Sequence, residues 1–377
     1  MELSNLFRSG KIGSVKIKNR IVRSATFTHT AEKYGYIGER VLKLYKDLAN
    51  GGSGLLITEA TAIDPGGTGG PYQVCLYDDS HMAGHKKLTS LIHNFDETKV
   101  AIQIQHSGRV GYHPKYPTIA PSPIPYKETG VTPRELATEE VKDYVDIFVN
   151  TAIRAYECEY DMVQLHAAHG YLLNNFISPY TNIRTDEYGG NTTKRVKILE
   201  EINNKIQDTV GKQFPVIIKF QSQDFIPNGI SEEEGIEIAK ILSNIGFDAI
   251  EPSGGARESL YYTKNSTPSR LIRKEEEENY FLPFAKKIKK FMKDTALILV
   301  GGIRNPLVAE KILQEKDADY ISLCRPLIYE PDLPNRWKSG DTTPAKCNSC
   351  NSCFVSMDQG PIFCATKRNR EKKNKSE

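Results

Sequence analysis

Short apolar runs alternate with longer amphipathic segments along most of the chain. The runs cover residues 19–23, 55–57, 100–104, 162–165, 216–220, 249–250, 297–300 and 320–323. They lack the strict alternation of apolar and polar residues that marks a half-exposed strand, so we expect strands that are buried on both faces. Apolar runs that alternate with helices predict a parallel sheet, and the presence of eight runs favours a (β/α)8 TIM barrel over an open doubly wound sheet.

The amphipathic segments have recognisable helix ends. Residues 40–50 carry apolar side chains on one face and stop at a glycine pair. Ser231, followed by Glu234, is the signature of a capping box and begins a predicted helix that reaches Asn244. Further helices are predicted over residues 80–95, 138–157, 192–210, 276–293 and 305–315. Residues 111–137 are rich in Pro and Tyr, and we expect them to form a long excursion from the core.

Composition and charge exclude several classes of protein. The 377 residues are 39% hydrophobic and 26% charged, which is ordinary for a globular protein and suits two domains or one barrel with insertions and a tail. The net charge of +3 is too small to predict binding to nucleic acid or to a membrane. The N-terminus has no long apolar stretch, and no run approaches the roughly 18 apolar residues of a spanning helix. We therefore expect a cytoplasmic protein.

Chemically active side chains gather where the fourth apolar run ends. His166, His169 and Tyr171 follow one another within a few residues. In parallel α/β proteins, ligands bind at the C-terminal ends of the strands. Two imidazoles can donate hydrogen bonds to one oxygen, and a nearby phenol can deliver a proton. These residues are therefore catalytic candidates, although a packing role stays open for each of them.

The loop after this cluster has a simpler interpretation. Arg184, Asp186 and Tyr188 precede a glycine pair. Polar residues at such positions usually serve the turn itself. We expect a loop that is held together by an ion pair.

A phosphate site is predicted near the last two strands. Gly301 and Gly302 follow the seventh run, and Arg325 follows the eighth, where barrels often bind phosphate. Glycine lets backbone N–H groups approach phosphate oxygens closely, and arginine adds a bidentate fork. Gln103 and Lys219, at the ends of the third and fifth runs, add an amide and a positive charge. Taken singly, a turn explains the glycine pair and a structural role explains each polar group equally well.

These residues lie in sequence strings that resemble the Old Yellow Enzyme family of FMN-dependent oxidoreductases. The strings are NRIVRSA (19–25), GLLITEA (54–60), IQIQHSGR (102–109), HAAHGYL (166–172), SPYTNIRTDEYGG (178–190), VGGI (300–303) and CRP (324–326). The resemblance runs from about Phe7 to about Asp332. It implies an FMN-binding barrel over residues 1–340.

The resemblance also implies a role for each candidate residue. His166 and His169 would bind the carbonyl oxygen of an α,β-unsaturated substrate (an enone), and Tyr171 would donate the proton. The implied FMN contacts are Ala60 and Gln103 at the ring, Lys219 beside flavin N1 and O2, and Gly301, Gly302, Cys324 and Arg325 around the phosphate. The implied reaction takes hydride from NADH or NADPH and reduces a carbon–carbon double bond.

Three positions depart from the family pattern. Lys219 stands where Arg is usual, which keeps the charge and loses the planar fork. Phe27 stands where many relatives place a Thr or Cys that contacts the flavin, so we expect an altered reduction potential. Cys324 replaces a common Gly beside the phosphate-binding Arg, and we expect it to crowd that loop.

The C-terminal region carries a cysteine array of the form C-x2-C-x2-C-x10-C. Its members are Cys347, Cys350, Cys353 and Cys364. Thiolates at these spacings can converge on one metal centre, either zinc or iron–sulfur. The array resembles the cluster loop in the branch of the family that contains trimethylamine dehydrogenase and dienoyl-CoA reductase, which implies a 4Fe–4S cluster in an extension over residues 341–366. Residues 367–377 are expected to form a disordered basic tail.

Three functional hypotheses follow. The leading one is an FMN-dependent ene-reductase. The second is a flavin and iron–sulfur subunit for electron transfer or demethylation that works with a partner protein. The third is a barrel lyase without flavin that binds a phosphorylated substrate. The sequence leaves the oligomeric state open, a homo-oligomer included.

Overall fold

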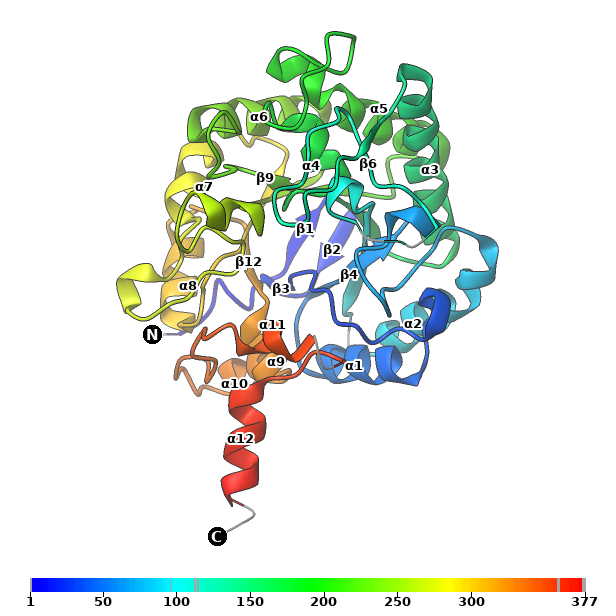
Figure 1. Cartoon of the computed structure of the whole chain (residues 1–377). Helices are drawn as coiled ribbons and strands as arrows, with labels where there is room; N and C mark the ends of the chain where they lie inside the picture. Colours follow the sequence, from blue (N-terminus) through cyan, green and yellow to red (C-terminus); the bar gives the residue numbers. More distant parts are fainter. Residues whose placement is uncertain (1, 96, 112, 114, 358–359, 375–377) are drawn as a thin grey trace.

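A closed barrel of eight parallel strands forms the centre of the chain (Figure 1). The computed structural model describes residues 2–95, 97–111, 113, 115–357 and 360–374. In barrel order the strands are β3 (Ile21–Arg23), β4 (Leu55–Ala62), β5 (Lys99–Gln105), β8 (Met162–Ala167), β9 (Val216–Gln221), β10 (Ala249–Ser253), β11 (Ala296–Leu299) and β12 (Tyr320–Leu323). Each strand contains or overlaps one of the predicted apolar runs, so the TIM barrel is confirmed.

Helices surround the barrel, because each buries one apolar face against the strands. The long helices are α1 (Glu39–Asn50), α2 (Met82–His93), α3 (Thr138–Glu157), α5 (Thr192–Val210), α6 (Glu232–Ile245), α7 (Leu282–Lys289) and α8 (Pro306–Gln314). The predicted start of α6 is confirmed, because the Ser231 side chain accepts a hydrogen bond from the Glu234 N–H. Within the described residues, no helix is both long enough and apolar enough to cross a membrane.

Two predicted segments differ in the structure. The helix expected over 276–293 is wrong in its extent, because α7 begins only at Leu282 and a short 3-10 turn lies at 275–277. Pro283 explains the late start, since proline is tolerated in the first turn of a helix and not in its interior. The segment expected to be a loop after β8 contains a short helix, α4 (Leu172–Ile177).

Smaller elements follow the C-terminal ends of β5 and β12. Within the long excursion, β6 (Ile119–Ala120) pairs with β7 (Arg134–Glu135). After β12 the chain forms α9 (Arg325–Tyr329), α10 (Leu333–Lys338) and α11 (Ser352–Met357).

The C-terminal segment differs from its prediction. Residues 367–374, expected to be part of a disordered tail, lie in helix α12 (Ala365–Asn374), which extends away from the barrel in Figure 1. Ala, Lys, Arg and Glu all have high helix propensity, which is the local reason for this helix. No residue of α12 is buried, and residues 375–377 lie outside the described part of the chain.

An N-terminal hairpin, which the sequence pattern did not reveal, packs against the beginnings of the barrel strands. Its strands are β1 (Gly10–Ile12) and β2 (Val15–Ile17). Ile12 and Ile17 are fully buried in one cluster with apolar residues from inside the barrel, which are Val22, Leu55, Ile57, Ala101, Met162, Ile217, Ala249, Ile298 and Tyr320. The hairpin therefore covers the end of the barrel opposite to the strand C-termini.

This packing predicts a stability effect. Ile17→Ala should lower the free energy of unfolding by about 2–5 kcal/mol, because it leaves a cavity in a fully buried cluster. Lys16→Ala, at the exposed neighbouring position, should change it by less than about 0.5 kcal/mol. Urea denaturation of the two variants beside the parent chain measures both values. Equal midpoints for Ile17→Ala and Lys16→Ala would show that the hairpin does not seal the barrel.

Candidate active site

His166, His169 and Tyr171 meet at the C-terminal end of β8. The centroids of the His169 and Tyr171 rings lie 4.9 and 5.0 Å from the His166 ring, and both contacts are edge to face. The structure therefore brings together the three residues that the sequence marks as catalytic candidates. Their catalytic roles stay predictions at this point.

His169 is held by two neighbouring strands. Its backbone N–H donates to Gln221 Oε1 at 3.0 Å, and its Nε2 lies 2.7 Å from Ser253 Oγ. Gln221 and Ser253 are the last residues of β9 and β10. His169 has a φ of 66°, a left-handed conformation that non-glycine residues adopt rarely and that the surroundings must stabilise. The position of this imidazole is thus set by the barrel and not by its own loop alone.

Burial controls the protonation of the cluster. Burial lowers the pKa of His166 well below its usual value, and the nearby His169 and Lys219 lower it further. Burial, with a smaller effect of Lys219, lowers the pKa of His169 to about 3. Burial also raises the pKa of the Tyr171 phenol. Near pH 7 the site therefore offers two neutral imidazoles and a protonated phenol.

Inside the barrel, apolar side chains give way to polar ones toward this end. Four strands show the change at alternate positions: Ala101, Gln103 and Gln105 in β5; Met162, Gln164 and His166 in β8; Ile217, Lys219 and Gln221 in β9; Ala249, Glu251 and Ser253 in β10. The first residue of each set belongs to the apolar cluster above the hairpin. A buried polar layer therefore lies directly beneath the His–Tyr cluster.

The members of this polar layer are bonded to one another across the barrel. Gln103 Nε2 donates to Gln164 Oε1 at 2.7 Å, and Gln164 Nε2 donates to Glu251 Oε2 at 2.9 Å. Lys219 Nζ lies 3.3 Å from Glu251 Oε2 and donates to Ser24 Oγ at 2.8 Å. Sequence reasoning singled out Gln103 and Lys219 but missed Gln164 and Glu251. The available signal for Glu251 was a carboxylate directly after the apolar run 249–250.

Gly301 and Gly302, after β11, both have positive φ angles, which glycine adopts readily. Gly301 and Gly302 have φ values of 116° and 79°. A Cβ atom on Gly302 would lie 2.7 Å from Ile272 Cδ1 and 2.9 Å from the Tyr280 ring. Other residues would therefore be both strained and sterically excluded at this loop.

Arg325 and Cys324 begin α9, beside this loop. One Arg325 nitrogen, Nη1, donates to the carbonyl oxygens of Arg270 and Ser349 at 2.8 and 3.0 Å. Cys324 Sγ lies 3.0 Å from Thr26 Oγ1, so the thiol packs toward the end of β3. The guanidinium is thus held in place at the strand end where the phosphate site was predicted.

The side chains present fit FMN. His166 Nδ1 is buried and has no hydrogen-bond partner among the described residues, although buried polar atoms are nearly always paired. Ala60, in β4, is small enough to face a flat ring. Lys219 and Arg325 supply positive charge suited to the pyrimidine edge and to the phosphate of an anionic cofactor. Phe27 contacts His29, with ring centroids 4.2 Å apart.

The four C-terminal cysteines do not form a metal site in this arrangement. Cys347 and Cys353 are buried, whereas Cys350 is exposed and its Sγ lies 3.2 Å from Ser352 Oγ. In the part of the chain that is described, no group of three or more Cys, His, Asp or Glu side chains is placed to hold a metal ion. The iron–sulfur centre at Cys347, Cys350, Cys353 and Cys364 stays a prediction from the sequence.

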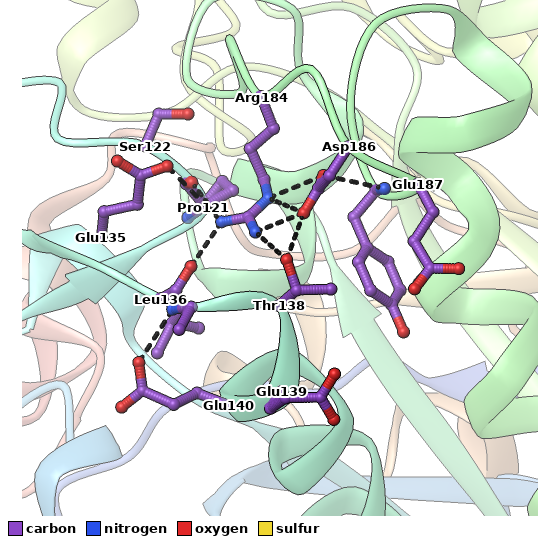
Figure 2. A network of polar contacts seen from close by, with 12 residues as sticks. Pro121, Ser122, Glu135, Leu136, Thr138, Glu139, Glu140, Arg184, Asp186 and Glu187 are labelled. Carbon is purple, nitrogen blue, oxygen red and sulfur yellow. Dashed lines mark hydrogen bonds and ion pairs between the residues drawn. The ribbon is translucent and has the colours of Figure 1, made fainter.

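The loop after the catalytic candidates is held by an ion pair, as predicted. Figure 2 shows the Arg184 guanidinium between Asp186 and the chain around Leu136. Arg184 Nε lies 3.0 Å from Asp186 Oδ1, and its Nη1 donates to Pro121 O at 3.0 Å. Asp186 Oδ2 also accepts from Thr138 Oγ1 at 2.7 Å. Arg184 therefore ties the β8–α5 connection to the β6–β7 excursion and to the start of α3.

A buried ion pair also lies among the loops at this end of the barrel. Arg109 binds Glu258, and both side chains are only 2% exposed. The guanidinium also lies 5.4 Å from the ring centroids of Tyr126 and Tyr180. Sequence reasoning did not predict this pair, because Arg109 and Glu258 lie on loops that only the fold brings together.

Comparison with known proteins agrees with this geometry. Residues 5–343 match the NADH:flavin oxidoreductase / NADH oxidase family. An NADH oxidase of Thermoanaerobacter brockii is 37% identical over 363 residues, which cover 95% of this chain and 54% of that protein. The chain thus spans about half the length of that relative.

Solved structures give the same result. A 2-naphthoyl-CoA reductase in complex with 2-naphthoyl-CoA superposes with a TM-score of 0.88 at 27% identity, covering 97% of this chain and 57% of that one. A morphinone reductase in complex with tetrahydroNAD superposes with a TM-score of 0.72 at 26% identity, covering 89% of this chain and 90% of that one. The chain therefore belongs to the NADH:flavin oxidoreductase / NADH oxidase family, a family of FMN-dependent oxidoreductases, as its resemblance to the Old Yellow Enzyme family predicted.

Proposed function

We propose that this chain reduces the carbon–carbon double bond of an α,β-unsaturated carbonyl compound, with FMN as cofactor and NADH or NADPH as the source of hydride. The observation that carries the proposal is the contact of the His166 ring with both His169 and Tyr171 above a buried polar layer. When bound, FMN would take hydride from the nicotinamide and pass it to the β-carbon of the enone. The side chains bind and polarise the substrate and supply the proton.

His166 and His169 bind the carbonyl oxygen in this proposal. Their lowered pKa values keep both imidazoles neutral, and a neutral imidazole donates one hydrogen bond through its N–H. In the tautomer that this role requires, the Ser253 hydroxyl donates to His169 Nε2 and the ring proton is on Nδ1. Because Gln221 also holds the His169 backbone, the ring needs little rearrangement when substrate arrives. Donors fixed in advance in a water-poor site stabilise the negative charge that grows on the carbonyl oxygen.

Tyr171 is the proton donor. Its ring contacts His166, so its phenol lies on the side of the site where the substrate carbonyl would bind. Burial raises its pKa, and the phenol therefore keeps its proton until it transfers it to the α-carbon.

Lys219, Gln103 and Arg325 hold the cofactor. The amide of Gln103 can pair with donor and acceptor atoms of the flavin pyrimidine edge. The Lys219 ammonium balances negative charge at that edge, and Arg325 with the Gly301–Gly302 loop binds the phosphate. Support for these assignments comes from the positions of Gln103 and Lys219 near the C-terminal ends of β5 and β9, and of Arg325 at the start of α9 after β12.

Removal of the Tyr171 hydroxyl separates the two half-reactions. Tyr171→Phe should slow oxidation of the reduced enzyme by an enone such as 2-cyclohexenone by about 10²- to 10⁴-fold, the usual contribution of a positioned general acid. Reduction of the enzyme by NADH or NADPH should keep its rate. Stopped-flow absorbance measures each half-reaction, with Tyr188→Phe as control, because Tyr188 is also buried but donates to Glu201 outside the site. Equal slowing of both half-reactions would remove Tyr171 from the donor role.

The pH dependence follows from the direction of the pKa shifts. Because the pKa of His169 falls to about 3 and that of Tyr171 rises, neither group changes protonation between about pH 5 and 9. The rate constant of enone reduction should therefore be flat across this range in single-turnover experiments. A step with a midpoint near about 6.5, the value of an unperturbed histidine, would contradict neutral imidazoles in the reacting state.

The phosphate contact can be tested apart from catalysis. Arg325→Met should weaken FMN binding by about 10- to 100-fold, the range expected when a charged hydrogen-bonding group of about 1.5–3 kcal/mol is lost. Riboflavin, which lacks the phosphate, should bind the variant and the parent chain equally. Fluorescence titration of the apoprotein gives both affinities, and Arg273→Met, at an exposed position, is the control. A parallel loss of riboflavin affinity would assign Arg325 a structural role only.

A second function has one specific observation in its favour. The cysteine segment packs against the predicted phosphate site, because Arg325 bonds to Ser349 O and Arg304 Nη1 donates to Cys347 O at 3.3 Å. The described structure does not gather the four cysteines around one ion, so this alternative is supported only by the position of the segment and by the spacing of its cysteines. Under this alternative, the purified chain would contain iron and would turn over no enone.

A further inference from the structure

Glu251 occupies an unusual position for a carboxylate. It is fully buried inside the barrel, in the middle of β10, where it pairs in register with Lys219 of β9. Four side chains reach it: Ser24 and Ser322 donate to Oε1 at 2.8 and 2.9 Å, Gln164 donates to Oε2 at 2.9 Å, and Lys219 Nζ lies 3.3 Å from Oε2. All four contacts of the carboxylate are with side chains inside the barrel.

This carboxylate also fixes the direction of the neighbouring amides. A carboxylate only accepts hydrogen bonds, so Gln164 must turn its NH2 group toward Glu251 and its oxygen toward Gln103. Gln103 must then donate its own NH2 group to Gln164. The Gln103 oxygen is left for a ligand, and it is an acceptor suited to the N3–H group of a flavin pyrimidine edge.

The same carboxylate lies against the ammonium group of Lys219 beneath the site. Lys219 Nζ donates to Ser24 Oγ, and the Ser24 hydroxyl donates in turn to Glu251. Because Lys219 also pairs directly with Glu251, the three side chains form a ring of contacts. In a medium of low dielectric constant, a negative charge at this distance offsets much of the field of the ammonium. The charge of Lys219 that a flavin ring would experience is thus set by its partner.

We propose that Glu251 is a positioning residue that sets the reduction equilibrium of the bound flavin, by balancing the charge of Lys219 and by orienting the Gln164–Gln103 amide chain. The proposal rests on the proposed function only in that Lys219 and Gln103 contact the flavin. It adds a residue, and a charge of opposite sign, to a site for which the sequence predicted only a cation.

A purely structural role does not explain this arrangement. The inward positions nearer the hairpin are filled by Ala101, Ile217 and Ala249, and they need no ions. A buried ion pair seldom stabilises a fold more than apolar residues of similar size would. The polar layer therefore has its physical reason at the end of the barrel where ligands bind.

The test is the midpoint potential of the purified, FMN-loaded chain. Glu251→Gln removes the charge and keeps the size, so it should shift the two-electron reduction equilibrium at least tenfold toward reduced flavin, a rise of about 30 mV. Glu310→Gln is the matched control: Glu310 is 2% exposed, lies in the outer helix α8 and binds Asn5 and Leu6, none of which belongs to the polar layer. An unchanged or lowered potential in Glu251→Gln overturns the proposal.

A double variant tests whether the effect of Glu251 on the flavin depends on Lys219. In Lys219→Met the buried carboxylate has lost its counter-charge and should take up a proton. Adding Glu251→Gln to Lys219→Met should then shift the equilibrium much less than in the parent chain. A shift of the full size in both backgrounds would show that Glu251 does not act with Lys219.

Ser322→Ala keeps the proposal testable if Glu251→Gln does not fold or hold FMN. Loss of one donor to Oε1 leaves more of the negative charge unbalanced, so the equilibrium should move a few-fold toward oxidised flavin, opposite to Glu251→Gln. No shift, or a shift toward reduced flavin, overturns the proposal. Since no enone enters these measurements, a failed enone assay would remove the proposed substrate and leave this inference intact.

Discussion

Closure of eight parallel strands into one barrel is the constraint on which the site depends. Closure places the C-terminal ends of all strands around one rim, so residues from distant parts of the chain become neighbours. His169 after β8, Gln221 from β9 and Ser253 from β10 meet in this way. The opposite end is covered by the β1–β2 hairpin, and the polar groups can therefore collect at one end of an otherwise apolar interior.

Desolvation of the buried side chains sets their protonation states. The same burial that lowers the pKa values of His166 and His169 raises that of Tyr171. These opposite shifts leave both imidazoles neutral and the phenol protonated over a wide pH range. Beneath them, the ion pair of Lys219 and Glu251 is stable only because hydrogen bonds satisfy the remaining carboxylate positions.

The loops above the rim are anchored by ion pairs of their own. Arg184 joins the β8–α5 connection to the β6–β7 excursion, and Arg109 with Glu258 joins the loops after β5 and β10. These contacts limit the motion of long segments that would otherwise have little core of their own. Ion pairs and hydrogen bonds therefore tie the loops around the site to one another.

The sequence by itself determined the barrel, most helix positions and the catalytic candidates, because apolar periodicity and helix caps act over a few residues. It did not determine the start of α7, the N-terminal hairpin or helix α12. Only the tertiary structure decided that Glu251 bonds to Gln164 and to Ser24, which lie 87 and 227 residues away along the chain. Such contacts depend on strand register and on barrel closure, and no local pattern of residues encodes either.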